Sequence, residues 1–185
     1  MEALPAGSAD LHYLLGTPFR SASPIGSRFR APAESGIWYG AETQRTACAE
    51  LGFWRWQFLV DSTGLESLGP SAQTVFQAGV HAQMVDLTAA PFVQSHAEWA
   101  HPEDYGVTQG FAHAAHSAGV DAIRYESVRD PRHGAAVAVL QPSCFKPRQS
   151  LQQATWFLTV RAAAVIWLRE GQTFEFDARE WRRLH

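Results

Sequence analysis

The chain has 185 residues, of which 46% are hydrophobic and 12% aromatic, while only 18% are charged. This composition is sufficient for a sizeable core and excludes an intrinsically disordered chain. The formal net charge of −3 and the lack of a basic helix argue against a protein that binds nucleic acid directly.

The positive charges are unevenly distributed along the chain. Residues 61–120 contain no Lys or Arg, and outside this segment every cation except Lys146 is an arginine. Arginine binds phosphate and carboxylate groups through a planar fork of donors that lysine lacks. The bias therefore suits a small phosphorylated ligand, although the codon usage of a GC-rich genome explains it equally well.

Neither a membrane span nor a metal site is expected. No apolar run is long enough to cross a bilayer, and residues 1–15 lack the basic and apolar regions of a signal peptide. Cys48 and Cys144 have no zinc-site spacing and make a weak disulfide framework. His113 and His116 could share a helix face but lack a clear third ligand. We therefore expect a cytoplasmic protein.

The first half of the chain predicts little regular structure before one helix. Residues 1–36 are rich in Gly, Pro, Ser and Ala and predict irregular backbone, and residues 37–39 predict a short strand. Thr43 is typical of the N-cap of a helix, which we expect over residues 44–54. The apolar face of this helix would carry three residues: Ala47, Leu51 and Trp54.

The remaining segments predict short strands around one further helix. Residues 57–60 favour a strand, residues 61–72 a loop, and residues 75–87 one or two strands. Residues 104–118 predict a helix that ends at Gly119. Further strands are expected at 122–125, 135–140, 156–160, 165–169 and 173–176, the last two joined by a tight turn at Glu170-Gly171. The pattern indicates a single α+β domain over residues 1–185.

Five residues are candidates for a functional site, and each also has an ordinary structural interpretation. Arg20 and Arg28 could bind a phosphate group or lie on the surface. Glu50 lies beside an apolar helix face, where a carboxylate is costly unless it is paired or used. Tyr39 and Ser127 come at the ends of predicted strands, Tyr39 as a candidate core residue and Ser127 as a candidate turn residue or hydrogen-bond donor to a ligand.

Taken in order, these residues lie in segments that resemble the RES domain, a family named for an arginine, a glutamate and a serine. The similar segments are GSRFRAP at 26–32, GIWYGAE at 36–42, TACAE at 46–50, YGVTQ at 105–109 and GVDAIRYESVR at 119–129. The similarity runs from about residue 18 to residue 145, and residues 146–185 would add C-terminal strands and a short helical tail.

The resemblance implies a fold like that of the ADP-ribosyltransferase toxins, with two small, mainly antiparallel sheets around an NAD⁺ cleft and flanking helices. It implies an NAD⁺-degrading toxin that cleaves the nicotinamide–ribose bond, with NAD⁺ as substrate, no true cofactor, and water or phosphate as acceptor. The expected partner is an Xre-family antitoxin that blocks the cleft. The aromatic-rich composition would also suit a homodimer.

The resemblance also implies a role for each candidate. Glu50 would stabilise the positive charge that develops on the ribose. Arg28, helped by Arg20, would bind the pyrophosphate, and Tyr39 would stack on the nicotinamide ring. Ser127 would donate a hydrogen bond to the nicotinamide ribose or amide.

Three residues depart from the family pattern. Ser21 replaces the aromatic residue that usually follows the first arginine, His116 stands where an arginine is expected, and Glu126 stands where a proline is frequent. Two other functions therefore stay open: a mono-ADP-ribosyltransferase that modifies a cellular protein, and a catalytically inert RES-like binding module.

Overall fold

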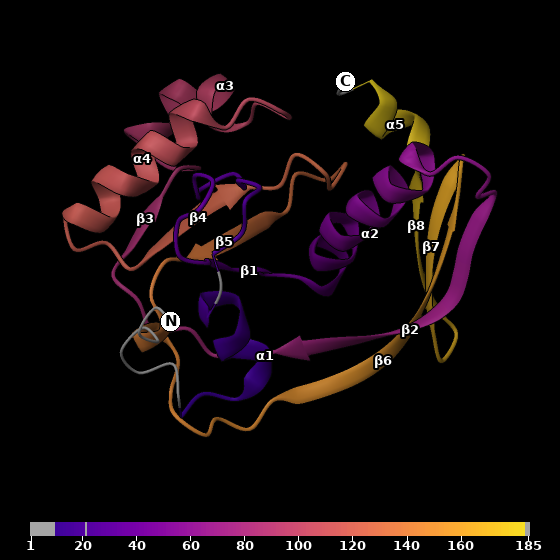
Figure 1. The fold of residues 1–185 in the computed structure, drawn as a ribbon, viewed down its shortest axis with the longest axis horizontal. Helices are drawn as coiled ribbons and strands as arrows, with labels where there is room; N and C mark the ends of the chain where they lie inside the picture. Colours follow the sequence, from indigo (N-terminus) through magenta and orange to yellow (C-terminus); the bar gives the residue numbers. More distant parts are fainter. Residues whose placement is uncertain (1–9, 21, 184–185) are drawn as a thin grey trace. The chain divides into compact units, whose positions relative to one another are not determined.

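The computed structural model describes residues 10–20 and 22–183, which form an α+β fold in two compact units (Figure 1). Unit 1 comprises Met1–Gly40, Ala78–Glu126 and Ala136–Leu151, and unit 2 comprises Ala41–Gln77, Ser127–Ala135 and Gln152–His185. Because the units alternate along the chain, no single linker separates them, and the composition shows no boundary. The predicted α+β class is confirmed, while a single domain over residues 1–185 stays a prediction.

Unit 1 is built on a four-stranded sheet covered by a helix. The strand order is β1-β5-β4-β3, and β3 pairs with β4 in parallel. The strands are β1 (Trp38–Ala41), β3 (Met84–Asp86), β4 (Ala122–Glu126) and β5 (Ala135–Val139). The helix α4 (Gly106–Ser117) buries Ala112 against Ile123 and Tyr125 of β4. The other helical elements of unit 1 are short: α1 (Tyr13–Gly16), η1 (Thr17–Arg20), η2 (Phe92–Ser95), α3 (His96–Trp99) and η3 (Pro142–Cys144).

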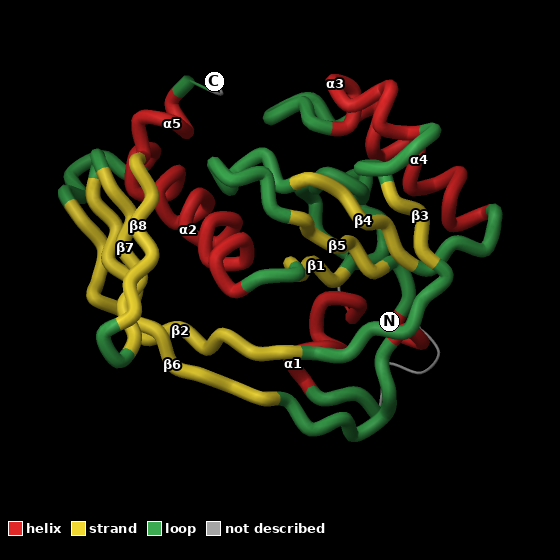
Figure 2. Tube along the Cα trace, turned by 180° about the vertical axis from the view of Figure 1, so that it is seen from behind, coloured by secondary structure: helices red, strands yellow, loops and turns green. Residues whose placement is uncertain are grey.

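Unit 2 contains a fully antiparallel sheet of order β2-β6-β7-β8 (Figure 2). Its strands are β2 (Ser67–Gln77), β6 (Gln152–Arg161), β7 (Ala164–Arg169) and β8 (Gln172–Asp177). The helix α2 (Gln44–Asp61) packs on this sheet, and α5 (Ala178–Arg182) follows β8. Six large aromatic side chains contribute to the core between these elements: Phe53, Trp56, Trp156, Trp167, Phe176 and Trp181.

The helix α2 is longer than predicted, and its buried face differs from the expected one. Thr43 caps it as expected, since its hydroxyl oxygen accepts a hydrogen bond from the Thr46 amide at 3.1 Å. The strand predicted at residues 57–60 is wrong, because Trp56 and Leu59 continue a helical face that packs on the sheet. The predicted inward face is also wrong: Leu51 and Trp54 are exposed, and the buried face carries Cys48, Ala49, Gly52, Phe53, Trp56 and Leu59.

The loop predicted at residues 61–72 is only partly present, because β2 already begins at Ser67. This part of β2 contains Gly69, Pro70 and two serines, which are typical of a loop, and the strand is stabilised there by its antiparallel pairing with β6. The register shifts between Leu68 and Ser71, where Gly69 has a φ of +92° and a Cβ would meet the Leu158 carbonyl oxygen at 2.3 Å. A β-bulge that only glycine tolerates therefore interrupts the strand.

The other predicted elements are confirmed with small changes of boundary. The expected helix is α4, and Gly119 follows it with a φ of +80°, as a C′ residue does. The five later strands are β4 to β8. Glu170 and Gly171, with φ of +47° and +81°, form the tight turn between β7 and β8.

The segment predicted as irregular contains short elements in its described part. The helices α1 and η1 lie within it, and Ser27 forms an isolated bridge with Arg30. Residues 1–9 and Ser21 of the predicted segment lie outside the described residues. Over the part of the chain that the structure describes, no helix is both long enough and apolar enough to cross a membrane.

Candidate functional site

Glu50 and Ser127, far apart in the sequence, meet in unit 2. Glu50 lies on α2 and is half-buried, and Ser127 directly follows β4 and is 0% exposed. The Ser127 hydroxyl donates a hydrogen bond of 2.5 Å to Oε1 of Glu50. The structure therefore brings the predicted glutamate and the predicted serine into direct contact.

The hydrogen bonds of Ser127 fix the direction of its proton. Its Oγ accepts hydrogen bonds from the backbone amides of Arg129 at 3.2 Å and Asp130 at 3.1 Å. A serine hydroxyl has two acceptor positions and one proton. Because both acceptor positions are occupied, the proton is directed at Glu50. In this structure Ser127 thus binds Glu50, and its expected contact with a ribose or an amide stays a prediction.

A second pair of side chains joins α2 to the same loop one helical turn earlier. The Thr46 hydroxyl donates to Oδ2 of Asp130 at 2.8 Å, and both side chains are buried. Oδ1 of Asp130 accepts from the Arg132 amide at 3.1 Å and lies 3.7 Å from Nε of Arg45. A carboxylate that is 2% exposed is costly unless it is paired and hydrogen-bonded, and these contacts meet that requirement.

The far side of this loop rests on the aromatic core of unit 2. The guanidinium of Arg129 lies 3.7 Å from the centroid of the Phe53 ring. The indole nitrogen of Trp181 donates to the Arg129 carbonyl at 2.7 Å. The loop that carries Ser127 is therefore held by packing as well as by hydrogen bonds.

Arg28 is a buried cation in unit 1 that no carboxylate of the described residues neutralises. It is 8% exposed, and its Nη1 donates to the carbonyls of Trp99 at 2.7 Å and His101 at 3.0 Å. Its guanidinium also lies 4.8 Å from the centroid of the Tyr105 ring. These partners orient the guanidinium but leave its positive charge without a neighbouring anion, so the site favours an anionic ligand.

The other two arginines of the N-terminal segment differ from Arg28. Arg30 donates through Nη1 to the carbonyls of Ser23, Ala31 and Glu34, and through Nη2 to that of Ile25, so it stabilises its own loop. Arg20 is exposed at the end of η1. Of the predicted phosphate-binding residues, Arg28 therefore has the environment of a ligand site.

Tyr39 lies close to the loop of Arg28. Its hydroxyl hydrogen-bonds with the Ser27 hydroxyl at 2.9 Å and accepts from the Phe29 amide at 3.1 Å. Burial raises the pKa of Tyr39, so the phenol stays neutral at physiological pH. The residue is nevertheless 38% exposed.

Two residues of α4 also hydrogen-bond to the loop that carries Arg28. Nε2 of Gln109 donates to the carbonyls of Ser27 at 2.9 Å and Arg30 at 3.2 Å, and the Thr108 hydroxyl donates to the Arg28 carbonyl. Thr108 is fully buried. The segment YGVTQ at 105–109 therefore fixes the backbone of the loop that carries Arg28.

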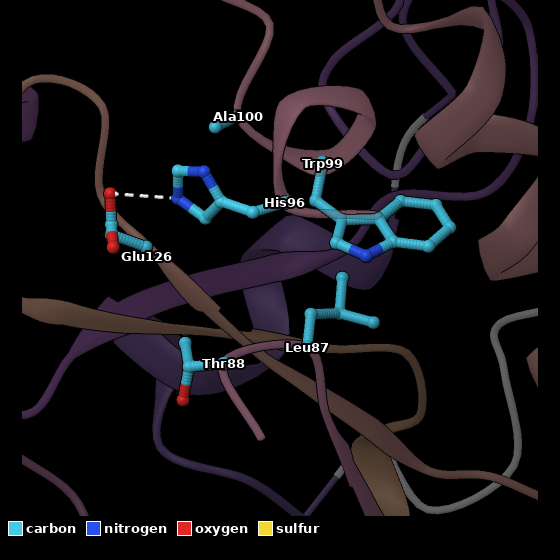
Figure 3. A pocket seen from close by; sticks show the side chains of 6 residues that line it. All are labelled: Leu87, Thr88, His96, Trp99, Ala100 and Glu126. Carbon is cyan, nitrogen blue, oxygen red and sulfur yellow. Dashed lines mark hydrogen bonds and ion pairs between the residues drawn. The ribbon is translucent and has the colours of Figure 1, made fainter. Parts of the chain in front are cut away.

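A small pocket lies in unit 1 (Figure 3). His96 and Glu126 point toward each other across it, with Nε2 and Oε1 3.1 Å apart. Trp99, whose carbonyl accepts from Arg28, forms part of its wall. Glu126, which departs from the family pattern, is thus a lining residue. The full lining is Leu87, Thr88, His96, Trp99, Ala100 and Glu126.

The two cysteines and the two histidines of α4 are the remaining candidates for nucleophilic or metal chemistry. Burial raises the pKa of Cys48 to about 12 and that of Cys144 to about 11, so both stay protonated thiols at neutral pH. His113 and His116 are exposed on α4. Within the described residues, no group of three or more His, Cys, Asp or Glu side chains is placed to hold a metal ion.

The candidate residues thus form two groups, one in each unit. In unit 1, Tyr39 of β1 hydrogen-bonds to the loop that carries Arg28, and in unit 2 Glu50 and Ser127 form a bonded pair. The sequence interpretation missed Asp130. Two features of the sequence point to Asp130. The four-residue spacing in TACAE places Thr46 and Glu50 on one face of the helix, and Asp130 follows Ser127 by three residues.

Gly134 closes the loop against Thr46, and we expect Gly134→Ala to destabilise the protein. A Cβ at this position would meet the Thr46 hydroxyl oxygen at 2.1 Å and Oδ2 of Asp130 at 2.9 Å. Both groups are buried and cannot move without losing their hydrogen bond, so the free energy of unfolding should fall by about 1–3 kcal/mol. Urea unfolding measures this value, with Gly171→Ala as the comparison for a strained but open position; an unchanged midpoint for Gly134→Ala would contradict the packing described.

The chain matches the family model of the RES domain over residues 5–160. No curated protein matches it. The matched range contains Arg28, Tyr39, Glu50 and Ser127 and ends within β6, so β7 and β8, which complete the sheet of unit 2, follow it. Because the match covers most of the 185 residues, the chain belongs to the RES-domain family.

Proposed function

We propose that this protein degrades NAD⁺ by cleaving the bond between nicotinamide and ribose, as the toxin of a toxin–antitoxin pair. The observation that carries the proposal is the hydrogen bond of 2.5 Å between Ser127 and Glu50. This bond holds the half-buried carboxylate of Glu50 in one orientation, and it joins two of the segments that resemble the RES family.

A fixed carboxylate suits the electronic demand of this reaction. When the C1′–N bond breaks, its electron pair leaves with nicotinamide and positive charge develops on the ribose. A preorganised negative charge stabilises such a transition state without reorganising at the moment of reaction. Glu50 would supply that charge, and Ser127 would keep it oriented. The leaving group is a cationic pyridinium that departs as a neutral molecule, so the chemistry needs no metal ion.

Arg28 supports an anionic substrate. A buried guanidinium without a neighbouring carboxylate gains most from a ligand that brings its own negative charge. The pyrophosphate of NAD⁺ is such a group, and we assign it to Arg28, with exposed Arg20 in a supporting role. Tyr39, which is partly exposed, would stack on the nicotinamide ring, whose positive charge favours a π face.

Incubation with NAD⁺ labelled in its adenylate half tests the proposal and identifies the acceptor. The purified protein is incubated with the label in buffer, in phosphate, and with a cell lysate. Hydrolysis gives free ADP-ribose and phosphorolysis gives its phosphorylated product, and either result supports NAD⁺ degradation. Label on a protein band would instead indicate a mono-ADP-ribosyltransferase, and intact NAD⁺ in every sample would indicate an inert binding module.

The toxin role has a separate test. Induced expression in a bacterium should stop growth and lower cellular NAD⁺, and co-expression of an Xre-family antitoxin encoded beside the gene should prevent both effects. Growth that continues at full rate with soluble wild-type protein present would contradict the toxin role.

A further inference from the structure

Two hydrogen bonds attach the loop after β4 to the same face of α2, one helical turn apart. Ser127 at the start of the loop bonds Glu50, and Asp130 in its middle bonds Thr46. Residues four apart on a helix lie one above the other. The loop therefore runs along α2 and cannot rotate about either attachment while the other is intact.

The bonds of Thr46 have a single direction. The Asp130 carboxylate only accepts, so the proton of Thr46 points at its Oδ2. The Thr46 and Thr43 hydroxyl oxygens are 2.7 Å apart, and Thr43 must therefore donate to Thr46. The N-cap of α2 thus begins a chain of oriented hydrogen bonds.

Asp130 connects Thr46 to Ser127, because its carboxylate binds Thr46 and its backbone amide binds Ser127. Its backbone amide donates to the Ser127 oxygen at 3.1 Å, filling one of the two acceptor positions that direct the serine proton to Glu50. The carboxylate of the same residue is held by Thr46 and by the Arg132 amide. If the side chain of Asp130 is released, its amide moves and Ser127 gains the freedom to turn its proton away.

We propose that Thr46 and Asp130 are positioning residues that act through Ser127 to hold Glu50 in its reactive orientation. This inference rests on the proposed function, because it assigns the reacting carboxylate to Glu50. Neither Thr46 nor Asp130 needs to touch the substrate. Both are buried, and their side chains hydrogen-bond to residues of unit 2.

Thr46→Val tests the inference, because it keeps the side-chain volume and removes the hydroxyl. We expect kcat to fall about ten- to hundredfold, as for other small displacements of a reacting group. The KM for NAD⁺ should change by less than about twofold, because the lost bond does not contact the substrate. Thr46→Ser restores the hydroxyl and should recover most of the rate.

A second variant separates positioning from a general loss of stability. Val160→Ala removes buried volume from β6 in the core of the same unit. Assayed well below its melting temperature, it should be destabilised at least as much as Thr46→Val, yet keep a kcat near that of the wild type. Equal losses of kcat in the two variants would overturn the inference.

A spectroscopic readout does not depend on turnover. In protein labelled with ¹³C at the glutamate carboxyl carbons, Glu50 is assigned by its absence in Glu50→Gln and titrated with pH. A hydrogen bond donated to the charged form favours that form, so the midpoint in Thr46→Val should move to higher pH, toward that of Ser127→Ala. An unchanged midpoint would overturn the inference even if the wild type proved inactive on NAD⁺, a result that would by itself reject only the proposed function.

Discussion

Replacing Glu50 with Gln is expected to abolish most of the NAD⁺-consuming activity while leaving the protein folded. The amide has the same shape and can still accept the hydrogen bond from Ser127, but it carries no negative charge. Loss of one preorganised electrostatic group costs about 10²- to 10³-fold in kcat. Nicotinamide release followed by chromatography measures the loss.

The matched control for this variant is Glu175→Gln on β8. Glu175 is an exposed carboxylate of the same unit, and its replacement should leave both activity and stability near those of the wild type. Wild-type turnover by folded Glu50→Gln would show that Glu50 is not the reacting carboxylate.

The second large effect is expected for Arg28→Lys, which keeps the positive charge and removes the planar fork. We expect the KM for NAD⁺ to rise about ten- to hundredfold, because a bidentate contact with the pyrophosphate becomes a single one. The effect on kcat should be smaller, since this contact is made in the ground state as well as in the transition state. Steady-state kinetics over a wide range of NAD⁺ concentration separates the two parameters.

Arg30→Lys is the control for this change, because Arg30 is equally buried two residues later and donates only to carbonyls of its own loop. It should lower the melting temperature with little change in KM. If both variants raised KM equally, the effect would come from disturbing the loop, and Arg28 would lose its assigned contact.

The candidate residues could be predicted from the sequence, but their contacts could not. The ordered segments around Arg28, Tyr39, Glu50 and Ser127 are similar to the RES family and identify these residues singly. That the proton of Ser127 points at Glu50 follows only from the two backbone amides that occupy its oxygen, which are set by the fold of the loop. Asp130 was missed for the same reason: a lone aspartate after a strand resembles a turn residue until Thr46 is seen to bind it.

The fold was predictable where one periodicity dominates and not where tertiary packing decides. The strands after residue 120 and the helix α4 have clear patterns and lie close to the predicted positions. The helix α2 has apolar residues on more than one face, so the stripe with Leu51 and Trp54 was mistaken for the inward one. The buried face of α2 is instead the one with Phe53 and Trp56, because these side chains pack against Trp181 in unit 2. The first half of β2 contains Gly69 and Pro70, which favour a loop, and the strand forms there through its pairing with β6.

The most direct test of the proposed function is the fate of NAD⁺ with purified wild-type protein, followed by chromatography with and without phosphate. We expect NAD⁺ to disappear and nicotinamide to be released in equal molar amount, and the dependence on phosphate then identifies the acceptor. NAD⁺ that stays intact under both conditions, with folded protein and no modified protein band in a lysate, would contradict the proposed function.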